Sequence, residues 1–229
     1  MKKLFAAAFA TLAYAGVNAQ TPAKPEMKNA IDSFSYALGL NVANSLKDQG
    51  VHDINTEMLK QAFNDVLKTN TPGMTQEVAI HILQNEMQKM GEKKLTAEKA
   101  KGQAFLEQNK KKKGVTVLPN GLQYEVLTAG DPAGAKPKAI DTVRVDYVGT
   151  TIDGTEFDSS IKRGEPTEFP LNGVIKGWTE ILQLMPKGSK WKVYIPSDLA
   201  YGDRGAGGHI PGGAVLIFEI TLHDIKPAK

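Results

Sequence analysis

The 229-residue chain has no cysteine, few aromatic residues and nearly equal numbers of basic and acidic residues. The absence of cysteine excludes disulfides, thiolate catalysis and Cys-ligated metals, and it also excludes a lipid-modified N-terminal cysteine. The formal net charge is +3, but Lys2 and Lys3 belong to a segment that we expect to be removed. The rest of the chain is then close to neutral, so no nucleic acid is expected as a partner.

Long apolar runs are also scarce, and the one at the start of the chain is short. Lys2 and Lys3 precede an apolar run from Leu4 to Ala15, and small residues follow at 17–19. This order is typical of a secretory signal peptide. The alternative, a membrane anchor, would need about 20 continuous apolar residues. We predict a signal peptide over 1–19, no membrane span and, in a bacterium, a periplasmic protein.

A helical region is predicted after a flexible leader at 20–30. In the first helix, which Asp32 or Ser33 would cap, apolar residues recur at turn spacing: Phe34, Leu38, Val42 and Leu46. Asn55 would cap a second helix with one apolar face: Leu59, Phe63, Val66 and Leu67. Two short helices bury little surface alone, which implies a partner for these faces.

A third helix is predicted from near Thr75 to about Asn109, with a length of about 50 Å. Gly91 and Gly102 weaken it and are candidate bending points. The methionines at 58, 74, 87 and 90 fit a plain core, or an adaptable dimer or client surface. The basic run at 110–113 suits a solvated helix end better than a nucleic-acid or lipid site. We place the domain boundary there, between 31–113 and 114–229.

From Val115 onwards the pattern is that of β-strands. Apolar and polar residues alternate over 122–126, 143–147 and 190–195, whereas 214–220 is nearly all apolar, as expected of a strand buried on both faces. One short helical pattern, from Ile175 to Met185, lies among these strands. Several antiparallel strands and one helix predict an α+β domain, with the helix packed into a curved sheet.

This C-terminal region resembles the FKBP family of macrolide-binding peptidyl-prolyl isomerases. The matching strings are VDYVG at 145–149, FDSS at 157–160, VIKGW at 174–178, AYG at 200–202, IP at 210–211 and LIFEI at 216–220. The helical part, with GVTVLPNGLQY at 114–124, resembles the dimeric periplasmic Mip/FkpA-like subgroup. The resemblance implies a half-barrel sheet around one short helix, and an all-α dimerisation module joined to it by a long helix.

The resemblance also implies a shallow apolar pocket. Its catalytic residues would be Asp158, Tyr201 and Tyr147, and its substrate-binding residues Phe157, Arg163, Val174, Ile175, Trp178, Ile210 and Phe218. Trp178 would form the floor, and Tyr147, Phe157 and Phe218 the walls. The Ile175 N–H and the Tyr201 hydroxyl would bind substrate carbonyls. Asp158 would face the rotating imide and hold Tyr147 or Arg163. We expect Phe169 and Trp191 to be core residues only.

Some features depart from the family pattern or point elsewhere. Thr167 stands where an aromatic wall is frequent, Ala206 where a histidine is frequent and His209 where an aliphatic residue is frequent. These departures bear on macrolide affinity and on the preferred residue before proline. The glycine-rich segment 202–208 lacks the Gly-Lys-Ser/Thr ending of a phosphate-binding loop, so we do not expect it to bind a nucleotide phosphate. The four histidines are dispersed, so no metal and no cofactor is expected.

The sequence therefore predicts an isomerase that accelerates proline-limited folding of exported proteins. Its partners would be unfolded or proline-containing polypeptides, macrolides such as tacrolimus or rapamycin as inhibitors, and a second copy of the chain. The alternative is a periplasmic holdase chaperone with incidental isomerase activity. A third function, as an adhesin, has no sequence feature in its favour.

Overall fold

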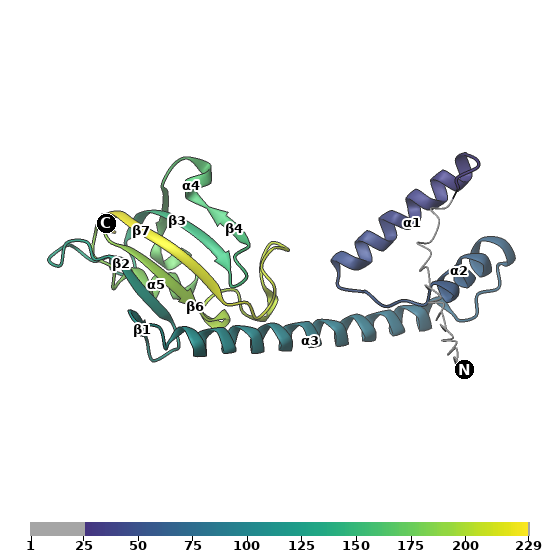
Figure 1. Ribbon diagram of the computed structural model, residues 1–229, viewed down its shortest axis with the longest axis horizontal. Helices are drawn as coiled ribbons and strands as arrows, with labels where there is room; N and C mark the ends of the chain where they lie inside the picture. The colour runs from purple at the N-terminus through teal and green to yellow at the C-terminus, as the bar shows by residue number, and fades with distance from the viewer. Residues whose placement is uncertain (1–25, 229) are drawn as a thin grey trace, which may run out of the picture. The chain divides into compact units, whose positions relative to one another are not determined.

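The computed structural model describes residues 26–228, and it forms two compact units that divide after Gly73 (Figure 1). The predicted signal peptide and most of the predicted leader lie outside the described residues. The predicted boundary at 113/114 lies four residues after the end of the long helix at Asn109, and this helix belongs to the same compact unit as the sheet. Within the described residues, no helix is long and apolar enough to cross a membrane.

The first unit begins with helix α1, Ala30–Asp48. Its N-cap is Asn29, whose side-chain oxygen accepts a hydrogen bond from the Asp32 N–H at 2.9 Å, so the predicted caps at Asp32 and Ser33 are wrong. An asparagine is a strong N-cap because its side chain satisfies one of the free N–H groups of the first turn. The helix ends before Gly50, which has a positive φ of 85°.

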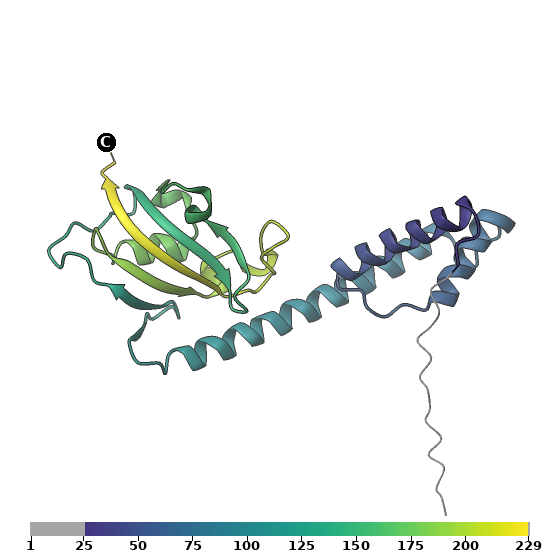
Figure 2. The same cartoon turned by 45° about the horizontal axis from the view of Figure 1, so that its top comes forward.

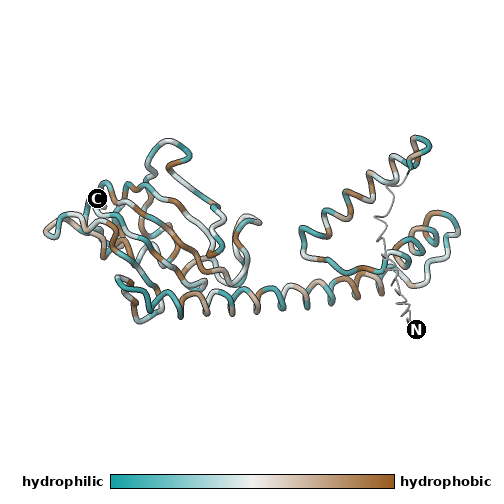
Figure 3. The backbone as a smooth tube through the Cα atoms, viewed as in Figure 1, coloured by the Kyte–Doolittle hydropathy of each residue, from teal (hydrophilic) through white to brown (hydrophobic). Residues whose placement is uncertain are grey.

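The second helix, α2, spans Thr56–Asn64 and is capped as predicted by Asn55, which accepts from two N–H groups. A π-helical turn, η1, continues it over Asp65–Thr69. No residue of α1, α2 or η1 is buried. Apolar positions recur along α1 (Figure 3), and together with residues of segment 54–67 they line a hollow of about 450 Å³.

The second unit begins with helix α3, Gln76–Asn109, which Thr75 caps. The helix continues without interruption through Gly91 and Gly102, the two predicted bending points (Figure 2). Gly102 has a packing role, because a Cβ there would lie 2.7 Å from the side chain of Val215. At the end of α3, the Gln123 side chain donates to the Leu106 carbonyl at 3.0 Å, which attaches the helix to the sheet.

The sheet has seven antiparallel strands in the order β1-β2-β6-β7-β3-β4, and β5 pairs with β3 beside β4. The strands are β1 Val115–Val117, β2 Gln123–Thr128, β3 Thr142–Thr151, β4 Glu156–Ser159, β5 Thr167–Pro170, β6 Lys190–Ile195 and β7 Leu216–Lys226. Short helices connect them: α4 Ser160–Arg163, η2 Leu171–Gly173, α5 Lys176–Leu182, η3 Ser197–Leu199 and η4 Gly202–Arg204.

Helix α5 packs into the curve of this sheet and forms the core with it (Figure 1). It is shorter than the predicted range 175–185, because Ile175 is its N-cap and the helix ends at Leu182. The prediction that 214–220 is buried on both faces is also wrong: Phe218 is buried, whereas Ile217 and Glu219 are partly exposed. Strand β7 lies between β6 and β3, but α5 covers only one of its faces.

Candidate active site

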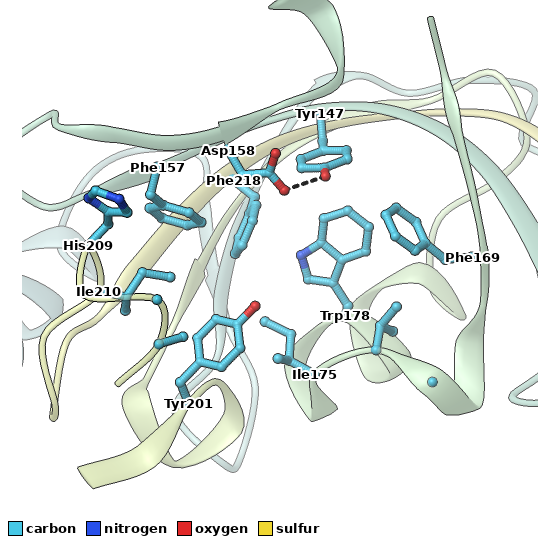
Figure 4. Close-up of a pocket in the computed structure, with 14 residues that line it drawn as sticks. Tyr147, Phe157, Asp158, Phe169, Ile175, Trp178, Tyr201, His209, Ile210 and Phe218 are labelled. Atoms are coloured by element: carbon cyan, nitrogen blue, oxygen red, sulfur yellow. Dashed lines mark hydrogen bonds between the residues drawn. The ribbon is translucent and has the colours of Figure 1, made fainter. Parts of the chain in front are cut away.

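A cavity of about 610 Å³ opens between α5, the sheet and the loop after η4 (Figure 4). All the predicted site residues line it except Arg163, which hydrogen-bonds to two of the lining residues, Asp158 and Tyr147. Five further residues line it: Phe169, Gly173, Ala206, Gly207 and His209. The cavity thus brings together residues of four strands, of α5 and the segment before it, and of the segments on either side of η4.

The floor of the cavity is Trp178, which lies on α5 and is 4% exposed. Three aromatic rings meet its indole in edge-on geometry: Tyr147 at 5.1 Å between ring centroids, Phe218 at 5.3 Å and Phe169 at 5.6 Å. Such edge-to-face contacts are favourable because the positive edge of one ring meets the negative face of another. The contacts fix the indole, whose buried Nε1 has no hydrogen-bond partner among the described residues.

The wall opposite Phe169 is formed by Phe157 and Phe218, whose rings meet edge-on at 5.6 Å. Both rings lie against Gly149 of β3. A Cβ at that position would be 2.7 Å from the Phe157 ring and 2.8 Å from the Phe218 ring. Glycine at 149 therefore allows the two rings to pack directly on the backbone of β3, and any side chain would push the wall into the cavity.

A polar cluster occupies one side of this apolar cavity. The Tyr147 hydroxyl donates to Asp158 at 2.5 Å, and the Arg163 guanidinium donates both to Asp158 and, at 2.8 Å, to the Tyr147 oxygen. Arg163 also donates to the Thr167 hydroxyl at 3.2 Å. Asp158 thus holds both Tyr147 and Arg163, where the sequence left open which of the two it would contact.

The charge of this cluster follows from its hydrogen bonds. Partial burial alone would raise the pKa of the Asp158 carboxyl, but hydrogen bonds from Tyr147 and Arg163 outweigh burial and place the pKa below its ordinary value. Burial and the neighbouring carboxylate both raise the pKa of the Tyr147 hydroxyl. At neutral pH the cavity therefore presents an ionised carboxylate beside a neutral phenol.

The local chain explains how Arg163 returns to Asp158. Ser159 caps α4 by accepting from the Lys162 N–H at 3.2 Å, and Gly164, with a φ of 83°, ends the helix after one turn. Asp158 and Arg163 consequently stand on either side of a single turn. The turn stabilised by the Ser159 side chain is compatible with a site role for Asp158.

The facing side of the cavity carries Tyr201 and the start of α5. The hydroxyl of Tyr201 points into the cavity (Figure 4), and this side chain is 42% exposed. Burial of the ring and then the negative charge of Asp158 raise the pKa of its hydroxyl. The Ile175 N–H makes no hydrogen bond to any residue that the structure describes. The Tyr201 hydroxyl has no hydrogen-bond partner within 26–228 either, so one hydroxyl and one N–H can meet a ligand.

Two expectations about aromatic residues had different outcomes. Trp191 is a core residue as predicted, 6% exposed and stacked on Tyr124 at 4.5 Å. The same expectation was wrong for Phe169, which lines the cavity beside Trp178. Phe169 lies two residues after Thr167 on β5, so both side chains leave the same face of the strand. That spacing was the available signal in the sequence.

The residues of the loop after η4 complete the mouth of the cavity. Ala206 and Ile210 pair through an isolated β-bridge, and His209 extends beside Phe157 (Figure 4). Ala206 and His209, which depart from the family pattern, are thus both at the cavity. In the part of the chain that the structure describes, no three His, Asp or Glu side chains gather as they would around a metal ion.

Two family models match the chain. The model for FKBP-type peptidyl-prolyl cis-trans isomerase matches residues 134–223, and the model for the domain amino-terminal to this isomerase matches residues 31–126. Helix α5 and all the residues that line the aromatic cavity lie in the first match. The chain belongs to the FKBP-type peptidyl-prolyl cis–trans isomerase family.

Individual relatives match over most of their length. Outer membrane protein MIP of Legionella longbeachae is 44% identical over 99% of this chain and 98% of its own length. The FKBP-type 22 kDa peptidyl-prolyl cis-trans isomerase of Escherichia coli is 44% identical over 83% of this chain and 93% of its own. Among solved structures, FkpA from Escherichia coli superposes with a TM-score of 0.72 at 39% identity, over 89% of this chain and all of that chain.

Proposed function

We propose that the cavity around Trp178 accelerates the cis–trans isomerisation of X–Pro bonds in folding polypeptides, by excluding water and binding the twisted imide. The observation that carries this proposal is the combination in one cavity of a fixed aromatic floor, an ionised carboxylate and two free donors. The proline ring would rest on Trp178 between Tyr147, Phe157 and Phe218. Val174 and Ile210 would contact the flanking residues of the substrate.

The chemistry of proline isomerisation needs no nucleophile and no metal, because no bond is made or broken. The barrier of about 18–20 kcal/mol reflects the resonance of the planar imide. Twisting removes that resonance and makes the group less dipolar, so an apolar cavity binds the twisted form better than water does. A rate gain of about 10⁴ corresponds to about 5.5 kcal/mol of preferential binding.

In this proposal the polar groups have separate tasks. The Tyr201 hydroxyl and the Ile175 N–H hydrogen-bond two substrate carbonyls and hold the chain across the cavity. Asp158 faces the imide carbonyl as it rotates, and it also holds the Tyr147 hydroxyl at 2.5 Å. Arg163 keeps Asp158 ionised and in place.

The holdase alternative has the exposed apolar helices of the first unit in its favour, but the catalytic pocket and the family favour the isomerase. We propose that these helices instead form a homodimer. Phe34 is 70% exposed and Phe63 48%, and a second copy would cover both. In sedimentation at micromolar concentration we expect a dimer, and Phe63→Glu should give monomers whereas the exposed polar change Lys60→Gln should not. A monomeric wild type would contradict the dimer.

We further propose that the protein acts in the periplasm, where a signal peptide over 1–19 would direct it, and that macrolides such as rapamycin occupy the cavity. Thr167 and Ala206 are smaller than the aromatic residue and the histidine that are frequent at these positions, which would leave the rim more open. Macrolide binding is therefore expected to be weaker than in a cavity with those two side chains, and calorimetric titration with rapamycin measures it.

A protease-coupled proline-isomerisation assay on the full chain tests the function. We expect turnover that rapamycin inhibits, and a lower kcat/KM in Asp158→Ala. The matched control is Asp224→Ala, which removes a carboxylate in a surface ion pair with Lys187 outside the cavity. Asp158→Ala at wild-type activity would refute the role of this carboxylate, and an inactive, folded wild type would refute the function.

A further inference from the structure

Strand β3 has a gap among its hydrogen-bonding partners on the edge beside the cavity. On that edge Thr142–Val145 pair with β5, and residues 148–150 pair with β4. Asp146 and Tyr147 lie between these two strands and pair with neither. The N–H of Tyr147, a residue of the site itself, therefore depends on some other group for its hydrogen bond.

The hydroxyl of Ser160 fills this gap. Ser160 is fully buried, and its Oγ accepts from the Tyr147 N–H at 2.9 Å and donates to Asp146 Oδ1 at 2.8 Å. A serine hydroxyl has one proton, so donating it to Asp146 leaves the oxygen lone pairs facing Tyr147. The carboxylate of Asp146 thus sets the orientation in which Ser160 supports the backbone of Tyr147.

The second oxygen of Asp146 is held from the neighbouring strand. His223 Nε2 lies 2.7 Å from Asp146 Oδ2. In the pairing of β3 with β7, Arg144 faces Asp224 and Val145 faces Leu222, so His223 is the extra residue of a β-bulge. Bulges redirect a side chain relative to the regular alternation of a strand. Here the bulge leaves the imidazole within hydrogen-bonding distance of Asp146.

The charges around Asp146 favour its ionised form. Burial alone would raise the pKa of its carboxyl, but hydrogen bonds from His223 and Ser160, together with the charge of Arg144, place the pKa below its ordinary value. An ionised carboxylate only accepts hydrogen bonds. His223 Nε2 must therefore carry a proton in this contact, and the chain of donors runs from His223 and Ser160 towards Asp146.

Ser160 is also the first residue of α4, which links the network to the cavity. The turn that Ser160 begins has Asp158 before it and Arg163 at its end, and these two side chains hold the Tyr147 hydroxyl. Ser160 therefore fixes the backbone of Tyr147 and, through the turn, the two partners of its hydroxyl. A displacement of Ser160 would move all three groups at once.

We infer that Asp146, held by His223, is a positioning residue for isomerisation: through Ser160 it sets the geometry of Tyr147, Asp158 and Arg163. The inference rests on the proposed function of the cavity. Asp146 does not line the cavity, so it acts through the cluster and does not touch substrate. A purely structural role, in which the network only joins β3 to β7, would affect stability but not the cluster.

The test compares kcat and KM of full-length variants with those of the wild type, well below their thermal midpoints. We expect Asp146→Ala to lower kcat/KM roughly tenfold, mainly through kcat, because catalytic groups about 1 Å out of place can lose up to about 100-fold in rate. Asp146→Asn keeps an acceptor for Ser160 and should stay within about twofold of the wild type. Asp224→Ala, a carboxylate loss on β7, should leave both constants unchanged.

A double-mutant cycle with Asp158→Ala separates positioning from a structural role. If Asp146 acts through the cluster, Asp146→Ala should change kcat/KM far less once the Asp158 carboxylate is gone. Equal effects in both backgrounds would overturn the inference, as would full activity in Asp146→Ala. If Asp146→Ala does not fold, His223→Leu replaces it in the same cycle, since it removes only the contact of His223 with Asp146. The same results would then support or overturn the inference. An inactive wild type would instead refute the proposed function.

Discussion

Gly149 offers a direct test of how closely the cavity wall packs on β3. In Gly149→Ala, the new methyl group would lie 2.7 Å from the Phe157 ring and 2.8 Å from the Phe218 ring. Carbon atoms pack best at about 3.5–4.0 Å, so each ring must move by roughly 1 Å. Both rings form the wall opposite Phe169, and the movement would narrow the cavity where the proline ring is proposed to bind.

Gly149→Ala is expected to lower activity much more than it lowers the stability of the fold. Overpacking a core costs about 1–3 kcal/mol, and we expect about 1 kcal/mol here, since the atoms in contact are ring ends that can tilt. A shift of about 1 Å in groups that contact substrate should lower kcat/KM about tenfold or more. The variant is thus predicted to lose activity while it remains folded.

Urea unfolding followed by tryptophan fluorescence and the protease-coupled assay measure the two effects. The chain has two tryptophans, Trp178 and Trp191, both in the sheet domain, so the fluorescence reports on that domain. The control is Gly91→Ala: a Cβ there meets nothing within 4 Å, and alanine favours helix by about 1 kcal/mol. If Gly149→Ala matched the wild type in both assays, the rings could not pack on β3 as described.

Three further predictions concern charge and hydrogen bonds. The pKa of Asp158 in the folded protein is below its ordinary value of about 3.9, so the ionised carboxylate stabilises the fold above about pH 3.9 and this stabilisation is lost as the pH falls through the folded-state pKa. We therefore expect kcat/KM to be flat from pH 8 to 5. A decline centred near pH 6 would contradict this assignment. Arg163→Met removes donors from that carboxylate, so the acid loss of activity should move to higher pH; an unchanged profile would exclude this effect of Arg163. Tyr194→Phe removes a hydrogen bond of 2.5 Å to Glu125 and should lower the free energy of unfolding in urea by about 1 kcal/mol without changing kcat/KM. A loss of activity would show that this bond supports the cavity.

Local sequence patterns predicted those elements whose formation depends on local chemistry. Asn55 and Thr75 cap helices as expected, because a side-chain oxygen beside free N–H groups acts within one turn. The alternation around Val145 and Val193 placed two strands, since each has one face on the core. The predicted cap of α1 was wrong because Asn29, Asp32 and Ser33 can all cap a helix, and composition alone does not rank them.

Features that depend on the neighbours of a residue in space were not predictable. The apolar run 214–220 suggested a strand buried on both faces, but burial on the second face depends on what covers β7. The spacing of Phe169 from Thr167 hinted at a shared strand face, but its place at the cavity depends on α5, which brings Trp178 beside it. Most of the candidate site came from the family resemblance. The contact of His223 with Asp146 depends on a bulge that no local pattern in β7 indicates.

Exchange NMR on a proline-containing peptide at equilibrium measures catalysis by the cavity without a coupled protease. We expect a catalytic amount of the full chain to accelerate exchange between the cis and trans signals. We also expect Trp178→Leu, verified as folded by its amide spectrum, to lose most of this acceleration. A folded wild type that leaves the exchange rate unchanged, or a Trp178→Leu variant as active as the wild type, would contradict isomerisation in this cavity.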